Sequence, residues 1–150
     1  MLAVTVIGEP ISVIAVSVVV AVIALFKGSH RLVVAILFGY VFFGINTLIK
    51  HLVQRTRPDT LFVEHMRIKS YSFPSGHAFG SMFFYGLLAY VAFTRLPHPW
   101  NLYSAILLGI LIFLIGVSRV YLGAHFPSDV VVGWLFAGAC LWLVIRFIKP

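Results

Sequence analysis

The sequence predicts an all-α integral membrane protein, folded as one domain over residues 1–150 into a bundle of about five transmembrane helices. Hydrophobic residues make up 61% of the chain and charged residues only 10%, with a mean hydropathy of +1.06. Soluble domains are about one quarter charged and at most about one half apolar. This chain cannot cover itself with polar side chains, so we expect lipid to be its main solvent.

Apolar segments of transmembrane length support this fold class. A helix that crosses a bilayer needs roughly 17–25 apolar residues. Five segments meet or approach this length: residues 10–26, 32–49, 75–94, 102–120 and 128–147. Nothing resembling a signal peptide precedes the first segment, so we expect it to act as an uncleaved insertion signal unless an N-terminal piece is absent.

Helix-breaking and polar residues separate these segments in order. Pro10 suits the first turn of the first helix, and the polar residues 27–31 divide it from the second segment. Prolines also lie beside the ends of later segments, at Pro74, Pro97 and Pro127. Proline cannot continue a helix, so the sequence itself marks where each helix begins or ends.

The net charge of +7 and the single cysteine limit the class of protein. The cations lie at the ends of apolar segments and form no basic stripe or tail, so we expect no nucleic-acid partner. Cys140 is the only cysteine, so no disulfide can form within the chain.

The distribution of charge predicts an orientation. One face of the predicted bundle carries five cations and no acid: Lys27, Arg31, Arg95, Arg146 and Lys149. The other face carries six cations and four acids. The two faces carry nearly equal numbers of cations, so the positive-inside rule alone is a weak guide to orientation. It decides the orientation more firmly when the cations of the expected active site are left out of the count. On that basis we expect a plasma (inner) membrane protein whose first face is cytoplasmic.

Three polar clusters interrupt the apolar sequence, and the alternation of helix directions places all of them on the outer face. They are Lys50 with Arg57-Pro58, then Pro74-Ser75-Gly76-His77, and then Ser118-Arg119 with His125 and Asp129. Ionisable groups in membrane segments are costly and usually line a pathway or do chemistry. We therefore expect the three clusters to form one site.

The first cluster offers two cations to an anion. Lys50 and Arg57 are seven residues apart, so both would point to one side if the helix continued past Lys50, and Pro58 would then end it. Arginine supplies a planar fork of donors for phosphate and lysine a mobile point charge, although a basic helix end at the interface is the alternative. We expect His51 and Arg55 to face the interface beside this cluster, or to touch a second phosphate.

The second cluster is typical of a helix N-terminus that binds anions, because proline, serine and glycine come just before an apolar run. Gly76 lets a ligand approach the main chain, and Ser75 offers a hydroxyl group. His77 would enter the same pocket and transfer a proton near neutral pH. A capped helix with an interfacial histidine is an equal alternative.

The third cluster predicts a nucleophile. His125 and Asp129 are four residues apart, at the expected start of the last helix. A carboxylate bonded to one imidazole nitrogen fixes the tautomer and makes the other nitrogen more nucleophilic. Arg119 adds a third cation. A helix cap at Asp129 beside a chance histidine explains the carboxylate well and the histidine poorly.

Together the clusters resemble the tripartite signature of the type-2 phosphatidic acid phosphatase superfamily: Lys-x6-Arg-Pro, Pro-Ser-Gly-His and Ser-Arg-x5-His-x3-Asp. Every signature position is filled between residues 50 and 129. The resemblance implies a lipid phosphatase that needs no metal or cofactor, and the outer face lacks a carboxylate cluster suited to magnesium. Members of this family usually have six transmembrane spans, and five are counted here. The span without a counterpart in this sequence would be the first of the six.

The resemblance also implies roles for the residues. His125 would attack phosphorus and form a phosphohistidine, Asp129 would orient it, and His77 would protonate the leaving oxygen. The phosphoryl oxygens would be held by Lys50, Arg57, Ser75, Gly76 and Arg119.

The substrate and the acceptor stay open. Phosphatidic acid, phosphatidylglycerol phosphate and undecaprenyl diphosphate are candidates, each entering sideways from the bilayer. A lipid phosphotransferase with the same site is one alternative. A non-enzymatic anion carrier is another, although the middle of each predicted span is almost uncharged. The sequence does not indicate the oligomeric state.

Overall fold

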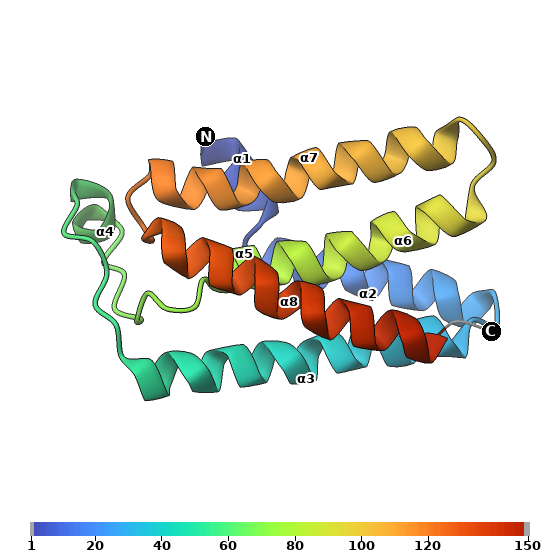
Figure 1. Cartoon of the computed structure of the whole chain (residues 1–150), viewed down its shortest axis with the longest axis horizontal. Coiled ribbons are helices and arrows are strands. Elements are labelled where there is room, and N and C mark those ends of the chain that lie inside the picture. Colours follow the sequence, from blue (N-terminus) through green and yellow to red (C-terminus); the bar gives the residue numbers. More distant parts are fainter. Residues whose placement is uncertain (1, 149–150) are drawn as a thin grey trace.

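A computed structural model describes residues 2–148, and these residues form helices joined by loops, with no β-strand among them (Figure 1). Lys149, assigned above to the cytoplasmic face, lies outside the described residues. The helices are α1 (Leu2–Ile7), α2 (Pro10–Phe26), α3 (His30–Val53), α4 (Leu61–His65), α5 (Gly76–Gly80), the π-helical turn η1 (Ser81–Tyr85), α6 (Gly86–Arg95), α7 (Trp100–Tyr121) and α8 (Pro127–Ile148). The predicted all-α class is confirmed.

Four of the described helices are long and apolar enough to cross a bilayer: α3, the continuous helix of α5, η1 and α6 (residues 76–95), α7 and α8. The remaining apolar helix of the expected bundle, α2, is shorter at 17 residues. Large apolar side chains point outward from the bundle, among them Ile11 (78% exposed), Leu107 (67%) and Phe147 (79%). Apolar surface of this extent suits a lipid environment, and the chain is an integral membrane protein.

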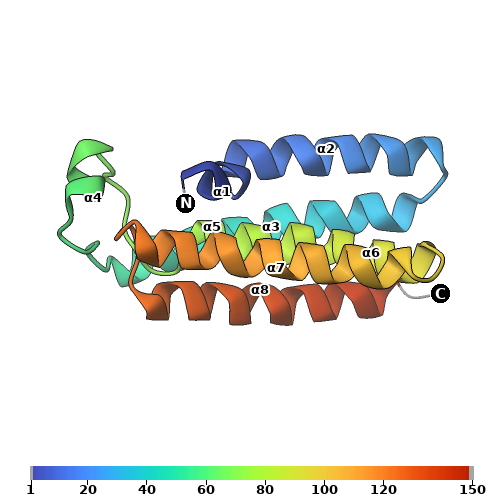
Figure 2. The same cartoon turned by 90° about the horizontal axis from the view of Figure 1, so that it is seen from above.

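Helix 76–95 forms the core of the bundle. In its most apolar stretch of 18 residues, 44% of the residues are buried, against 22–28% of the residues in the corresponding stretches of the other three long helices. Figures 1 and 2 show it enclosed by α2, α3, α7 and α8. Phe79 and Phe83 are fully buried and stack with ring centroids 6.2 Å apart. Gly39 allows α3 to pack closely against helix 76–95, because a Cβ at this position would lie 2.4 Å from the Phe83 ring.

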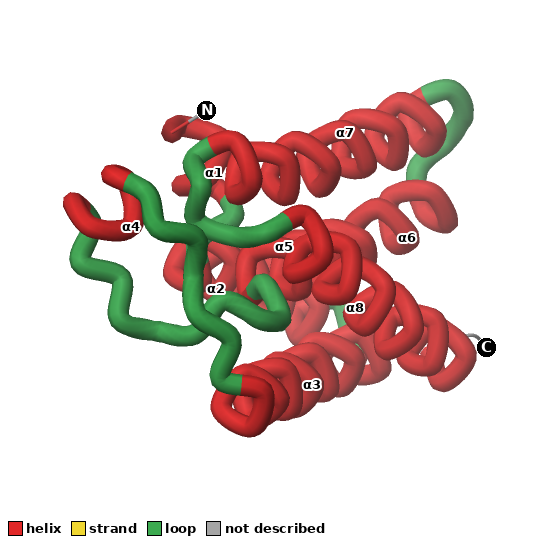
Figure 3. The backbone as a smooth tube through the Cα atoms, turned by 60° about the vertical axis from the view of Figure 1, so that its left-hand side comes forward, coloured by secondary structure: helices red, strands yellow, loops and turns green. Residues whose placement is uncertain are grey.

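Loops gather at both ends of the bundle. The end that we call the α4 end carries residues 54–75, which include α4, and the connection 122–126 (Figure 3). The opposite end carries the connections 27–29 and 96–99. All three polar clusters lie at the α4 end, and their placement depends on how the long 54–75 segment is folded.

The structure shows how far the helix that contains Lys50 continues at this end. The helix that contains Lys50 does not continue to Pro58, because α3 ends at Val53. Gln54 adopts a left-handed conformation, with φ of 52°, and its N–H donates to the Lys50 carbonyl oxygen at 3.1 Å. This C-cap ends the helix before the proline can do so. Arg57 therefore reaches the cluster from a loop, without helical register to Lys50.

Candidate active site

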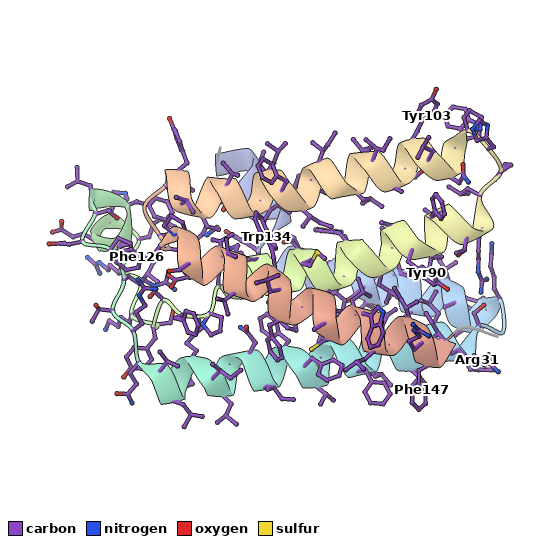
Figure 4. All side chains as sticks on the ribbon, in the orientation of Figure 1. Arg31, Tyr90, Tyr103, Phe126, Trp134 and Phe147 are labelled. Atoms are coloured by element: carbon purple, nitrogen blue, oxygen red, sulfur yellow. The ribbon has the colours of Figure 1, made fainter. Side chains whose placement is uncertain are left out.

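The predicted site residues come from helix ends and loops at the α4 end. They are Lys50 (last turn of α3), Arg57 (loop before α4), Ser75, Gly76 and His77 (start of α5), Arg119 (end of α7), His125 (connection 122–126) and Asp129 (first turn of α8). Figure 4 marks this end by Phe126, the neighbour of His125. Asp129 is fully buried, and His125 and Arg119 are 3% and 5% exposed. Charged groups are rarely buried to this degree without partners or a function.

A histidine and a carboxylate face each other at the start of α8. Nδ1 of His125 lies 3.5 Å from Oδ2 of Asp129, which is longer than a normal hydrogen bond. The backbone N–H of Phe126 donates to the same oxygen at 2.9 Å, so Asp129 also caps its helix. The N–H groups of Ala124 and His125 both donate to the Arg119 carbonyl oxygen, at 3.0 and 3.2 Å. These bonds fix the connection 122–126 against α7.

Burial keeps the imidazole of His125 neutral. Desolvation lowers its pKa to about 4; the side chain of Asp129 raises the pKa in part, and the surrounding cations lower it further. Nε2 of His125 lies 3.2 Å from Nη1 of Arg57. A guanidinium can only donate, so Nε2 is the acceptor and Nδ1 carries the proton toward Asp129. The unprotonated nitrogen thus faces the cation.

Arg57 is held in place by the loop that precedes α5. Its Nε donates to the Ser70 carbonyl oxygen at 2.7 Å, and its Nη2 donates to the Ser70 hydroxyl at 2.9 Å. Nη1 also donates to the Ala124 carbonyl oxygen at 2.7 Å, which places it beside His125. Burial lowers the pKa of Arg57 and Asp129 offsets this in part, but a guanidinium remains charged at neutral pH.

Lys50 connects α3 to the same loop. Its ammonium donates to the carbonyl oxygens of Pro74 at 2.8 Å and Tyr71 at 3.0 Å. Within the described part of the chain, these two carbonyls account for two of its three donors. The remaining donor is suited to an anion that also contacts Arg57.

Arg119 and His77 each present a buried polar atom that makes no hydrogen bond within the described residues: Nε of Arg119 and Nε2 of His77. An unpaired buried polar atom costs roughly 1–3 kcal/mol. Nη1 of Arg119, in contrast, donates to Oγ1 of Thr5 at 2.6 Å. His77 interacts electrostatically with Arg119 and His125, so both unpaired atoms belong to one cluster. Each is suited to contact a polar ligand.

Ser75 ties the starts of α5 and α8 together. Its Oγ caps α5 by accepting a first-turn N–H at 3.4 Å, and its own N–H donates to the Asp129 carbonyl oxygen at 3.0 Å. Gly133 permits this approach, because a Cβ there would lie 2.9 Å from the Ser75 carbonyl oxygen. At Gly76, a Cβ would meet Phe43 at an ordinary 3.6 Å, so the protein packing gives no steric reason for glycine there.

Arg55 belongs to the cluster, although the sequence did not place it among the expected site residues. Its Nη1 lies 2.8 Å from Oδ1 of Asp129 and also donates to the Ser128 hydroxyl at 2.8 Å. Its guanidinium stacks 4.1 Å from the Phe126 ring centroid. We expected Arg55 to face the interface or a second phosphate, but it pairs with the carboxylate behind His125. The only signal in the sequence was its position two residues before Arg57.

An apolar groove of about 390 Å³ runs between α7 and α8 beside the cluster. Its walls include Val120, next to Arg119, and Val130, next to Asp129. Figure 4 shows Trp134 between these two helices, and a Cβ at Gly116 would lie 2.0 Å from its ring. A polar site therefore adjoins a surface suited to hydrocarbon.

The chemistry of the cluster follows from its charges. Besides Arg55, which pairs with Asp129, three cations surround two imidazole rings and one carboxylate, and this arrangement suits the binding of a phosphate group. An unprotonated imidazole nitrogen can attack such a group. Among the described residues, no group of three or more His, Cys, Asp or Glu side chains could hold a metal ion together.

Comparison with known proteins identifies the family. The PAP2 superfamily model matches residues 28–150, which include all three clusters. The chain belongs to the PAP2 superfamily. The resemblance seen in the signature residues is thereby confirmed.

Similar proteins include phosphatidylglycerophosphatase B of Bacillus subtilis, 36% identical over 107 residues, which cover 69% of this chain and 51% of that protein. An undecaprenyl-diphosphatase of Sulfolobus acidocaldarius is 27% identical over 135 residues, 85% of this chain and 61% of the other. The chain thus spans between one half and two thirds of the length of these curated relatives.

The fold is also that of a solved structure. The crystal structure of a transmembrane PAP2-type phosphatidylglycerolphosphate phosphatase from Bacillus subtilis superposes with a TM-score of 0.86 at 28% identity. The similarity covers 97% of this chain and 73% of the other. The PAP2 fold therefore extends through α1 and α2, beyond the residues that the family model matches.

Proposed function

We propose that residues 1–150 act as one membrane-embedded domain that hydrolyses a lipid phosphate or diphosphate without a metal ion. The observation that carries this proposal is the position of the His125 imidazole between the Asp129 carboxylate and the Arg57 guanidinium. This arrangement gives a nucleophile, a group that stabilises its positive charge, and a cation that binds the phosphate under attack.

In the first step, Nε2 of His125 forms a bond to phosphorus as the bond between phosphorus and the lipid oxygen breaks. The substrate phosphate takes the donors of Arg57, which frees the Nε2 lone pair from its contact with Nη1. Asp129 stabilises the charge that develops on the ring. His77, protonated on both ring nitrogens when the phosphate anion is bound beside it, gives one proton to the leaving oxygen. The products are the dephosphorylated lipid (or a lipid monophosphate, from a diphosphate) and a phosphohistidine.

In the second step, a water molecule attacks the phosphohistidine. His77, left without its proton after the first step, takes a proton from this water. The bond between Nε2 and phosphorus breaks, and inorganic phosphate leaves with the new oxygen. Both histidines return to their starting protonation states, so the cycle is balanced.

Cations and donors around phosphorus stabilise the transition state. Lys50, Arg57 and Arg119 surround the cluster, and the unpaired Nε of Arg119 supplies a donor without loss of another bond. We assign Ser75 and the Gly76 amide to the same cradle. Removal of one well-placed donor costs ~3 kcal/mol, which is on the order of a hundredfold in rate.

The substrate is an amphiphile in this proposal, because the groove between α7 and α8 opens beside the cluster. A lipid tail in that groove would leave its phosphate at Arg119 and His125. Phosphatidic acid, phosphatidylglycerol phosphate and undecaprenyl diphosphate all fit this description. The names of the two curated relatives favour the second and third.

The proposed orientation places the cluster outside the cell, in the plasma (inner) membrane. Lys27, Arg31, Arg95 and Arg146 lie toward the opposite end, in or beside the connections and the last turn of α8. When the clustered cations of the α4 end are set aside, the positive-inside rule makes the opposite end cytoplasmic.

A phosphate-release assay tests the proposal. The purified protein in EDTA should release inorganic phosphate from a panel of lipid phosphates, and His125→Ala should abolish release. Release by that variant, or a strict requirement for an added metal, would overturn the mechanism. Labelled phosphate with a candidate acceptor lipid distinguishes hydrolysis from transfer, because a phosphotransferase would label the acceptor.

A further inference from the structure

A second cavity, of about 930 Å³, lies at the opposite end of the bundle from the proposed active site. It forms where the connection 27–29 and the start of α3 face the last turns of α6, with Ile148 of α8 at one side. Its volume falls within the range of about 300–1,000 Å³ that small-molecule sites occupy. The proposed phosphatase mechanism makes no use of it.

The wall of this cavity is basic. Arg31 and Arg95 line it together with His30. Nη1 of Arg95 donates to the Ser29 hydroxyl at 3.3 Å, which connects the end of α6 to the connection 27–29. The four acidic residues of the sequence, Glu9, Asp59, Glu64 and Asp129, all lie outside the cavity wall. The described residues of the wall therefore carry a net positive charge.

An apolar groove of about 180 Å³ continues from this cavity between α3 and α8. The two share His30, Arg31 and Ile148. The other walls of the groove are apolar: Val34, Ala35, Phe38, Val144 and Phe147. Figure 4 shows Arg31 and Phe147 at the same end of the bundle. The polar cavity and the apolar groove thus meet at Arg31.

We propose that this cavity and groove bind an anionic phospholipid from the leaflet at the opposite end, as a site separate from catalysis. Its phosphate would lie between Arg31 and Arg95, and one acyl chain would follow the groove between α3 and α8. Guanidinium groups match the geometry of phosphate oxygens. The basic cavity therefore suits the phosphate headgroup of the lipid, and the apolar groove beside it suits the acyl chain.

The depth of the cavity agrees with a headgroup. It lies at the helix ends, where the connections 27–29 and 96–99 leave the bundle. Trp100 begins α7 at this end and is 64% exposed, as expected for an aromatic side chain at the membrane interface. A lipid held there would contact α3, α6 and α8 together, so it would stabilise the bundle.

The test uses the full chain in a non-ionic detergent, titrated with dioleoyl phosphatidylglycerol, with bound lipid counted by native mass spectrometry. This lipid is a phosphodiester, so binding is measured without turnover and independently of whether the protein is a phosphatase. The double variant Arg31→Gln/Arg95→Gln should weaken binding by at least about tenfold. The matched control Lys27→Gln/Arg146→Gln removes the same charge at this end from residues that do not line the cavity, and should change binding less than about twofold.

Two further measurements distinguish a lipid from a free anion as the ligand. Val34→Trp, which fills the groove, should weaken lipid binding and leave the binding of inorganic phosphate unchanged. Equal loss in the cavity and control variants would show attraction to general surface charge and would overturn the proposal. So would inorganic phosphate binding as tightly as the lipid, which would indicate a site for a free anion. Circular dichroism confirms that each variant is folded.

Discussion

Nη1 of Arg55 lies 2.8 Å from Oδ1 of Asp129, so the carboxylate that faces the proposed nucleophile also has a permanent cationic partner. Its other oxygen accepts the Phe126 N–H and faces Nδ1 of His125. Asp129 is fully buried, whereas the side chain of Arg55 is 35% exposed. The ion pair holds the Asp129 carboxylate beside the His125 ring. Arg55 is therefore proposed as a positioning residue.

Arg55→Gln should lower kcat about tenfold, with KM changed less than about twofold, because the residue orients Asp129 and does not hold phosphate. Arg55→Lys should recover part of kcat by restoring the charge. The control is Arg67→Gln, in an exposed part of the loop, which should leave both constants unchanged. An increase in KM alone would show that Arg55 contacts the substrate instead.

The depressed pKa of His125 predicts that this proposed nucleophile stays unprotonated in mild acid. A free histidine titrates near pH 6.5, but burial lowers the pKa of His125 to about 4. Protonation would remove the lone pair, so activity that depends on His125 should be lost only as the pH falls toward about 4. NMR titration of labelled imidazoles, with the signal assigned by its loss in His125→Gln, measures the midpoint directly. A midpoint above about 6 would contradict the proposed environment.

Thr5 should contribute to activity through Arg119, although it lies more than a hundred residues away in the sequence. Its hydroxyl accepts from Nη1 of Arg119 at 2.6 Å and from the Ser118 hydroxyl at 3.2 Å. Thr5→Val keeps the shape and removes this acceptor, so kcat/KM should fall about tenfold. Thr47→Val is the matched control, since its hydroxyl bonds only to its own helix at Phe43 among the described residues. Equal effects of the two changes would exclude the proposed link.

The contact between α5 and α8 at Gly133 should be sensitive to a single methyl group. Gly133→Ala would place a Cβ 2.9 Å from the Ser75 carbonyl oxygen, and backbone cannot move away easily. We expect a loss of about 1–3 kcal/mol in stability and a fall in activity. Gly109→Ala, where nothing lies within 4 Å of the new Cβ, should cost nothing and gain up to about 1 kcal/mol in helix propensity. Thermal unfolding in detergent compares the two, and similar melting temperatures would count against the close contact.

Much of this protein could be predicted from particular residues. The helix that starts at Ser75 was predictable because a serine cap before an apolar run satisfies free N–H groups locally. The start of α8 followed from Pro127 and Asp129 for the same reason. Whether α3 continues from Lys50 to Pro58 could not be predicted, because the left-handed cap at Gln54 depends on how the following loop packs. The π-helical turn Ser81–Tyr85 left no pattern that distinguishes it from an α-helix.

The sequence by itself determined the membrane environment, the helical class and the grouping of the polar clusters at one end of the bundle. These follow from composition, segment length and alternation of direction, which are properties of the chain before it packs. Only the tertiary structure decided that Arg55 pairs with Asp129, that Thr5 holds Arg119 and that Arg57 reaches His125 from a loop. Such contacts join residues far apart in the sequence, and a side chain takes its partner from whatever the packed helices bring within hydrogen-bond distance.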